Sequence, residues 1–237
     1  MEPKWSITDF DIEKWRKFVK TVKNTKKVKE RIEKNVKRKR IILSKKKIWY
    51  VIVGCQITTQ QRSDEGSKVD LFLKSKSFVH NFDRYKKTKS KITAVKNELV
   101  TYGIGKNKQI SEYLKEIYDL LEGGDWVILI ESLKSLKKNT TIRKERETAK
   151  YVTRYKGLGN KQSRNFLQWL GVSKFEIPID SRVTNKMKKM VCEFVPSPSA
   201  LQDISTYLFL ENSLQIISKK LYIHPCVLDA CMFIEND

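Results

Sequence analysis

The stretch Tyr155-Lys156-Gly157-Leu158-Gly159-Asn160-Lys161-Gln162-Ser163-Arg164-Asn165-Phe166-Leu167 decides how this chain is interpreted. Two glycines flank one apolar residue between two segments with a helical pattern, 142–155 and 160–171. Glycine permits a positive φ and the close approach of another backbone, and amides at the start of the second helix can bind an anion. The stretch therefore predicts a helical hairpin that can hold one phosphate, although an ordinary helix–helix turn also uses glycine.

A second informative stretch, Glu176-Ile177-Pro178-Ile179-Asp180-Ser181-Arg182-Val183, follows the hairpin. We expect Asp180 at the start of a helix, where its carboxylate would accept hydrogen bonds from free backbone amides. It lies 180 − 161 = 19 residues after Lys161. Taken alone, Asp180 is explained by helix capping and Lys161 by phosphate binding, so neither residue on its own indicates an enzyme.

Together the two stretches resemble the helix-hairpin-helix DNA glycosylases over residues 155–183. In the lyase-active branch of that family a lysine follows the second hairpin glycine by two positions, as Lys161 follows Gly159. An aspartate ends an apolar-Pro-apolar run, as Asp180 does, and the spacing of 19 resembles that of the 8-oxoguanine glycosylase branch. Many family hairpins have proline where this chain has Lys156, and the smaller prokaryotic 8-oxoguanine enzymes have lysine there.

Weaker matches extend the resemblance to residues 45–237. Residues 102–110 look like the family's glycine–lysine segment before a long helix, and residues 123–126 and 133–136 continue the same order. Residues 228–230 resemble the terminal helix of the smaller prokaryotic enzymes. The first forty residues match nothing in the family, and the substrate-contacting residues of its larger eukaryotic-type members have no clear counterparts.

The segment from Ile48 to Ile57 is ambiguous on periodicity alone. Its composition suits a buried strand, whereas its length, if it continues to Arg62, suits a fully buried helix. The resemblance favours the helix, which in the family ends in a polar turn that reaches into the DNA.

Elsewhere the apolar residues recur mainly at helical spacing and few convincing strands are present, so we predict an all-α protein. A helix over 107–121 should stop at Gly123-Gly124, and Asp125 should cap the next helix. The last two helices should begin near Ser199, as the first residue of a capping box, and near Pro225.

The resemblance implies two helical lobes with a substrate cleft between them. We divide the chain into a basic N-terminal helical segment, 1–44, and a glycosylase domain, 45–237, with its hairpin at 142–171. Apolar residues within 10–23 recur at helical spacing. Lys and Arg dominate residues 14–47, either as the solvated face of a helix or as part of a phosphate-binding surface.

The overall charge indicates a polyanionic partner. Forty-nine Lys and Arg against twenty-seven Asp and Glu give a formal net charge of +22. Nucleic acid is the usual polyanion, because each neutralised phosphate releases a counterion. An acidic membrane surface and a Lys-rich proteome are the alternative explanations. No apolar run approaches the ~20 residues that a membrane span needs.

No metal or cofactor is required by the expected chemistry, although the resemblance allows an ion to bridge the hairpin carbonyls and a phosphate. The histidines, His80 and His224, are too few for a histidine-rich site. Scattered cysteines without zinc or iron–sulfur spacing suggest a reduced compartment. Because the residues after Met1 also lack the apolar stretch of a signal peptide, we expect a cytoplasmic, nucleoid-associated protein in a prokaryote or a nuclear one in a eukaryote. The cysteines are Cys55, Cys192, Cys226 and Cys231.

The resemblance implies a reaction on a nucleotide that is flipped out of duplex DNA. A polar side chain would fill the gap that the nucleotide leaves, and Gln60 is the first candidate, although a polar helix end would look the same. The hairpin would hold the DNA backbone beside the lesion. The DNA-binding candidates are Gln60, Gln61, Arg62, Lys156, Gly157 and Gly159.

The resemblance gives the two catalytic candidates, Lys161 and Asp180, different roles. Asp180 would stabilise the positive charge that develops on the sugar, and its place at a helix N-terminus should keep it ionised. Lys161 would attack C1′ and form a Schiff base, which permits strand cleavage by β-elimination. Only a neutral lysine can attack, so burial, the helix N-terminus and neighbouring cations must lower its pKa from about 10.4.

Three functions remain open at this stage. The first is a bifunctional glycosylase and abasic-site lyase, with 8-oxoguanine as the expected lesion and oxidised pyrimidines as the alternative. The second is a monofunctional glycosylase in which water attacks, and the third is a non-catalytic DNA-binding module. The expected partner is double-stranded DNA with a damaged base, bound by a monomer. Aromatic residues that could stack on the base, although most are better explained as core, are Phe166, Trp169, Tyr222 and Phe233.

Overall fold

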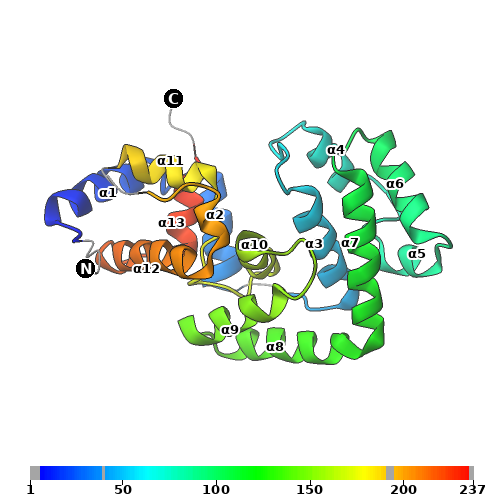
Figure 1. Cartoon of the computed structure of the whole chain (residues 1–237). Helices are drawn as coiled ribbons and strands as arrows, with labels where there is room; N and C mark the ends of the chain where they lie inside the picture. Colours follow the sequence, from blue (N-terminus) through cyan, green and yellow to red (C-terminus); the bar gives the residue numbers. More distant parts are fainter. Residues whose placement is uncertain (1–5, 39–40, 191–194, 235–237) are drawn as a thin grey trace.

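The computed structural model describes residues 6–38, 41–190 and 195–234, and every regular element in these ranges is a helix (Figure 1). The all-α prediction is therefore confirmed. In chain order the elements are α1 (Asp9–Val22), α2 (Lys26–Arg31), the π-helical turn η1 (Ile32–Val36), α3 (Lys45–Ile57), α4 (Lys68–Lys74), α5 (Phe82–Lys87), α6 (Lys91–Thr101), α7 (Asn107–Leu120), the π-helical turn η2 (Leu121–Asp125), α8 (Trp126–Lys138), α9 (Ile142–Val152), α10 (Asn160–Leu170), α11 (Ser181–Lys189), the 3₁₀ turn η3 (Ala200–Gln202), α12 (Ile204–Lys220) and α13 (Pro225–Met232).

Two hydrophobic cores divide the helices into two lobes (Figure 1). The first core is built by α3 to α10, from Ile41 to Val172. The second is built by α1 and α2 together with α11, α12 and α13. Helix α10 belongs to the first lobe and lies toward the second, and a linker of residues 171–180 crosses from α10 to α11. The two-lobed architecture is thus observed, and the substrate cleft between the lobes stays a prediction.

The N-terminal helices are part of the second lobe. The apolar stripe expected within residues 10–23 is the buried face of α1, where Trp15 is 1 % exposed, whereas Phe10 points into solvent. This face packs in one core with residues of α12 and α13. The division that we made at residue 44 does not follow these cores, because the amphipathic stripe revealed that α1 is buried but not which helices bury it.

Helix α3 resolves the ambiguous segment in favour of a helix. It begins after Ser44, whose hydroxyl accepts a hydrogen bond from the amide of Lys47, and from Val51 to Ile57 each of its residues is buried. A helix buried on all sides carries no amphipathic period, so the sequence could not separate it from a buried strand. Helix α3 packs against α5, α7 and α10, which makes it the central element of the first lobe.

Two predicted helix caps are wrong. Gly124, with φ of +125°, interrupts the chain between α7 and α8, but Asp125 has helical dihedral angles and its carboxylate accepts no amide hydrogen bond at the start of α8. Similarly, Ser199 precedes η3 without capping it. Helix α12 begins later, after Asp203, whose carboxylate accepts a hydrogen bond of 2.8 Å from the amide of Thr206. In both cases a residue of suitable type lies near a helix start but lacks the extended backbone that a capping residue needs.

Candidate active site

The predicted hairpin is formed by α9, a turn that contains Gly157, and α10. Gly157 has φ of +81°, and a Cβ atom there would lie 2.5 Å from Oε1 of Gln56 and 2.7 Å from the ring of Tyr113. Glycine is therefore required at this position both for the backbone conformation and for space. The side-chain amide of Gln56 also donates a hydrogen bond of 2.6 Å to the carbonyl of Lys156. Gln56 was not among the residues predicted from the sequence, although a polar side chain inside the apolar segment of α3 indicates a specific buried partner.

Gly159 differs from Gly157, because it has an extended backbone and a Cβ atom there would meet no atom within 4 Å. It immediately precedes α10 and offers no side chain to cap it. No side chain of the residue before α10 caps its first amides, as an anion-binding helix start requires. Nearby, the ammonium of Lys156 is exposed and lies 3.0 Å from the carboxylate of Glu116. Such an exposed pair is weak, so a DNA phosphate can compete for Lys156.

The structure brings Lys161 and Asp180 together. The ammonium nitrogen of Lys161, the second residue of α10, lies 3.2 Å from Oδ2 of Asp180. Asp180 caps α11 as predicted, because its Oδ1 accepts hydrogen bonds of 3.0 and 3.2 Å from the amides of Arg182 and Val183. The side chain of Lys161 is 32 % exposed and that of Asp180 is 13 % exposed. The amine is thus accessible from solvent, while the carboxylate is largely enclosed.

Asp180 is held in its ionised form. Burial pushes the pKa of this carboxyl up, but hydrogen bonds from Arg182, the charges of Lys161 and Arg182 and the amide of Val183 outweigh it, so the pKa lies below its ordinary value. The guanidinium of Arg182 lies 2.7 Å from Oδ2, the oxygen that also faces Lys161. Two cations therefore share one carboxylate oxygen. Arg182 was not among the site residues predicted from the sequence, although a cation two residues after Asp180 can contact its carboxylate.

A cluster of charged groups continues beyond Arg182 toward α2 and α13. The guanidinium of Arg182 lies 3.9 Å, and the ammonium of Lys27 lies 3.2 Å, from the ring centroid of Phe233. Asp229 is buried and 2.8 Å from Arg31, and burial and the charge of Asp180 are among the causes that raise its pKa. The lysine–aspartate pair therefore lies where residues from α2, α10, α11 and α13 approach one another.

Of the aromatic residues considered for base stacking, Phe233 lies at this cluster. Phe166 is fully buried in the first core. Trp169 packs over Gly54, where its ring would lie 2.6 Å from an added Cβ atom. Tyr222 is 94 % exposed at the end of α12. The contact of Phe233 with Arg182 singles it out among the four.

The three candidate residues in the turn that follows α3, Gln60, Gln61 and Arg62, have different environments. Gln61 is tied to the turn before α7, because its Oε1 accepts a hydrogen bond of 2.8 Å from the amide of Gly105. Arg62 is exposed and lies 2.8 Å from Asp64. Gln60 is exposed, with φ of +58°, and accepts a hydrogen bond from Lys106. The side chain of Gln61 is thus bonded to the turn before α7, whereas that of Gln60 is exposed and bonded to Lys106.

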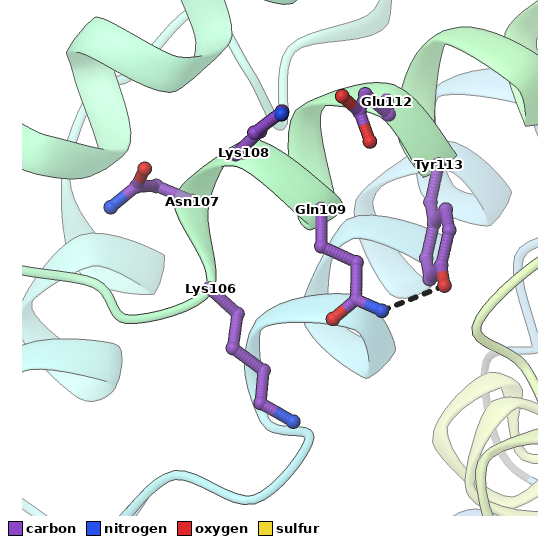
Figure 2. A pocket seen from close by; sticks show the side chains of 6 residues that line it. All are labelled: Lys106, Asn107, Lys108, Gln109, Glu112 and Tyr113. Carbon is purple, nitrogen blue, oxygen red and sulfur yellow. Dashed lines mark hydrogen bonds between the residues drawn. The ribbon is translucent and has the colours of Figure 1, made fainter.

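The same turn is linked to the hairpin helix and borders a shallow pocket. Nε2 of Gln162, the residue after Lys161, donates a hydrogen bond of 2.9 Å to the hydroxyl of Thr59. On the other side, Lys106 belongs to an open pocket at the start of α7 (Figure 2). Within that pocket the side-chain amide of Gln109 donates a hydrogen bond of 2.7 Å to the hydroxyl of Tyr113. The residues that line the pocket are Lys106, Asn107, Lys108, Gln109, Glu112 and Tyr113.

The described residues contain neither a cluster suited to a metal ion nor a helix able to span a membrane. No group of three or more His, Cys, Asp or Glu side chains there could hold a metal ion. None of the helices in these ranges combines the length and the apolar character that crossing a bilayer demands. Cys55, Cys226 and Cys231 are buried free thiols, and Cys192 lies outside the described residues.

The chain is similar to known proteins in structure but not in sequence. No protein-family profile matches the chain, and no curated protein matches it in sequence. Two crystal structures of the 8-oxoguanine DNA glycosylase of Methanocaldococcus jannaschii match it. One has a TM-score of 0.64 at 17 % identity over 94 % of this chain and 91 % of that one. The other, a complex with a 15mer DNA that contains 8-oxoguanine, has a TM-score of 0.68 at 15 % identity over 92 % and 94 %. The chain therefore has the fold of an archaeal 8-oxoguanine DNA glycosylase, in agreement with the resemblance seen in residues 155–183.

Proposed function

We propose that this protein excises an oxidised base, 8-oxoguanine, from duplex DNA and then cleaves the strand as an abasic-site lyase. The observation that carries this proposal is the 3.2 Å contact between the ammonium of Lys161 and the carboxylate of Asp180. Lys161 is the second residue of α10, directly after the glycine turn of the hairpin. The fold supports it, because the matching structures are of a glycosylase and of a glycosylase/lyase bound to 8-oxoguanine DNA.

The two side chains suit the two steps of the reaction. As the glycosidic bond breaks, its electron pair leaves with the base, which takes up a proton, and positive charge develops on the sugar. The ionised Asp180 stabilises that charge. Lys161 loses a proton, and its nitrogen forms a bond to C1′ of the flipped nucleotide. Opening of the sugar ring, in which O4′ takes up a proton, gives a Schiff base. Loss of a proton from C2′ then forms the C2′–C3′ double bond and expels the 3′ phosphate with the C3′–O electron pair by β-elimination.

The surroundings of the pair suit DNA binding. The uncapped amides of α10 after Gly159 can hold a phosphate, with Lys156 beside them. Gln60, exposed at the tip of the turn after α3, is our candidate for filling the gap left by the flipped nucleotide, and the hydrogen bond between Gln162 and Thr59 connects that turn to α10. The net charge of +22 supplies the general attraction to the duplex.

Borohydride trapping on duplexes that contain 8-oxoguanine tests the proposal. We expect a covalent complex with the wild type and none with Lys161→Gln. Asp180→Asn should still cap α11 and bind DNA but should not release the base. Base release without trapping would indicate the monofunctional reaction, and binding without base release would indicate a non-catalytic DNA-binding protein. A panel of lesions, each opposite every base, identifies the substrate and separates 8-oxoguanine from oxidised pyrimidines.

A further inference from the structure

The linker from α10 to α11 is largely buried, and side chains satisfy most of its backbone groups. The carboxylate of Glu145, on α9, accepts hydrogen bonds of 2.7, 2.8 and 3.0 Å from the amides of Lys174, Phe175 and Glu176. An irregular segment inside a protein needs such partners for each of its polar groups. The first half of the linker is therefore anchored to the first lobe.

The second half of the linker is anchored to α12 by Tyr207. The hydroxyl of Tyr207 accepts a hydrogen bond of 2.8 Å from the amide of Ile179 and donates one of 2.8 Å to the carbonyl of Ile177. Tyr207 is 1 % exposed, so water does not compete for these groups. Because Asp180 directly follows Ile179, this hydroxyl is the last side-chain anchor before the catalytic carboxylate.

Glu211, one turn further along α12, connects the same segment to the helix that carries Lys161. Its Oε1 accepts a hydrogen bond of 2.7 Å from the amide of Ile177 and one of 3.1 Å from Nε of Arg164. Arg164 in turn donates a hydrogen bond of 3.1 Å to the carbonyl of Asn160, the residue before Lys161. A continuous set of buried contacts thus runs from the start of α10 to the residue before Asp180.

We propose that Tyr207 is a positioning residue that sets the distance between Lys161 and Asp180. This inference rests on the proposed function. Without its hydroxyl, the amide of Ile179 and the carbonyl of Ile177 would be buried and unpaired, so the segment would relax toward other partners. Asp180 would move with the segment, whereas Lys161 would stay on α10. A misplacement of about 1 Å in a catalytic group can cost on the order of 10²-fold in rate.

The first test compares Tyr207→Phe with the matched control Ser213→Ala in the full chain. The control also removes a buried hydroxyl from α12, but that hydroxyl donates only to the carbonyl of Phe209 in the same helix. We expect Tyr207→Phe to lower the single-turnover rate of base release by about 10-fold or more, with the Kd for lesion DNA within about twofold, and the control to change neither. A rate loss no larger than the control's, or one matched by weaker binding, overturns the inference.

A second measurement does not depend on activity. Carboxyl NMR of the free protein reports the pKa of Asp180, which burial raises and which the hydrogen bond from Arg182 and then the charge of Lys161 lower. In Tyr207→Phe the pKa should rise because the two groups separate, and in Ser213→Ala it should stay. An unchanged titration overturns the positioning role even if base release falls. A wild type that releases no base refutes the proposed function, while the NMR comparison still decides the role of Tyr207.

Rescue provides a further check. Replacing Tyr207 by 4-aminophenylalanine keeps the ring and restores a donor toward the carbonyl of Ile177. We expect this variant to recover part of the rate and of the Asp180 pKa that Tyr207→Phe loses. Equal loss in both variants, at equal thermal stability, contradicts the inference.

Discussion

At Asp180 each carboxylate oxygen has a separate task. Oδ1 accepts the amides that start α11, whereas Oδ2 faces both Lys161 and Arg182. The cap fixes the orientation of the carboxylate, so Oδ2 is directed at the amine. In the reaction that we propose, Lys161 would give up its proton to attack, and Arg182 would be the cation that remains next to Asp180. The sequence indicated the lysine and the aspartate through their family spacing, but not the guanidinium between Asp180 and Phe233.

Arg182→Met should move the acid limb of the pH–rate profile for base release to higher pH. Burial raises the pKa of Asp180, and hydrogen bonds and charge from Arg182 are major causes that lower it. Without them the carboxylate takes up a proton at a higher pH, and the ionised form needed for catalysis is lost earlier as the pH falls. Single-turnover rates between about pH 4 and about pH 8 measure this.

Lys27→Met is the matched control for that shift. Its ammonium lies over the same Phe233 ring, at 3.2 Å from the centroid, but it is not among the main causes that lower the pKa of Asp180. We expect its acid limb to coincide with that of the wild type. Equal shifts in both variants, or no shift in Arg182→Met, would contradict the role given to Arg182.

At the scale of the elements, the two hairpin glycines belong to one sequence pattern but have different surroundings. Gly157 is enclosed by α3 and α7, whereas Gly159 faces open space before α10. The sequence predicted the turn and both helices, because a Gly-apolar-Gly unit between two helical patterns is typical of a helix–helix turn. It could not separate the two glycines, because their difference depends on Gln56 and Tyr113, which are distant in the sequence.

Substituting each glycine by alanine should separate stability from DNA binding. Gly157→Ala should lower the free energy of unfolding by roughly 1–3 kcal/mol for the positive φ alone, with a further loss from the contact with Gln56. Gly159→Ala should unfold like the wild type but bind lesion DNA more weakly, because its Cβ projects where a phosphate would approach α10. Urea unfolding and duplex titration measure the two effects, and a destabilised Gly159→Ala protein would argue against this division.

Three buried carboxylates lie along the linker: Glu176 and Glu211 pair with Arg146 and Arg164, and Glu145 accepts the amide of Glu176. Burial, followed by the charge of Glu211, raises the pKa of Glu176 to about 8, although both arginines oppose this. The folded protein thus holds a proton that the unfolded chain releases near the ordinary value of 4.5. The associated stability is fully present below that value and is lost as the pH rises through about 8.

Glu176→Gln should therefore flatten the pH dependence of stability. The amide mimics the protonated carboxyl, so the variant should match the wild type at about pH 5 and exceed it in free energy of unfolding at about pH 9. Urea unfolding at the two pH values measures this. A variant less stable than the wild type at the higher pH would show that ionised Glu176 is the form that the fold requires.

At the scale of the whole molecule, the sequence predicted the helical class and the charge more reliably than the division into lobes. Periodicity marks which face of α1 is buried, but the partner helices lie at the other end of the chain. The burial of the linker could not be predicted either. Its partners, such as Glu145 and Tyr207, look like ordinary surface and core residues in the sequence. The positive charge, by contrast, is a property of composition and needs no fold.

That charge predicts a steep salt dependence of DNA binding. The logarithm of the association constant should fall linearly with the logarithm of salt concentration, and Lys156→Gln should reduce the slope by about 1 if Lys156 contacts one phosphate. Lys220→Gln serves as the control, because this lysine lies against Ile7 and Asp9 at the N-terminal end of the second lobe. Identical slopes for Lys156→Gln and the wild type would remove Lys156 from the DNA contact.

Identification of the amine that becomes attached to DNA tests the central claim most directly. Reductive trapping on 8-oxoguanine duplex, followed by peptide mass spectrometry, locates the covalent bond on a single residue. The convergence of Lys161 and Asp180 predicts the adduct on the peptide that contains Lys161, and its loss in Asp180→Asn, which cannot release the base. An adduct on any other amine, or base release with no adduct at all, would contradict the assignment of Lys161 as the nucleophile.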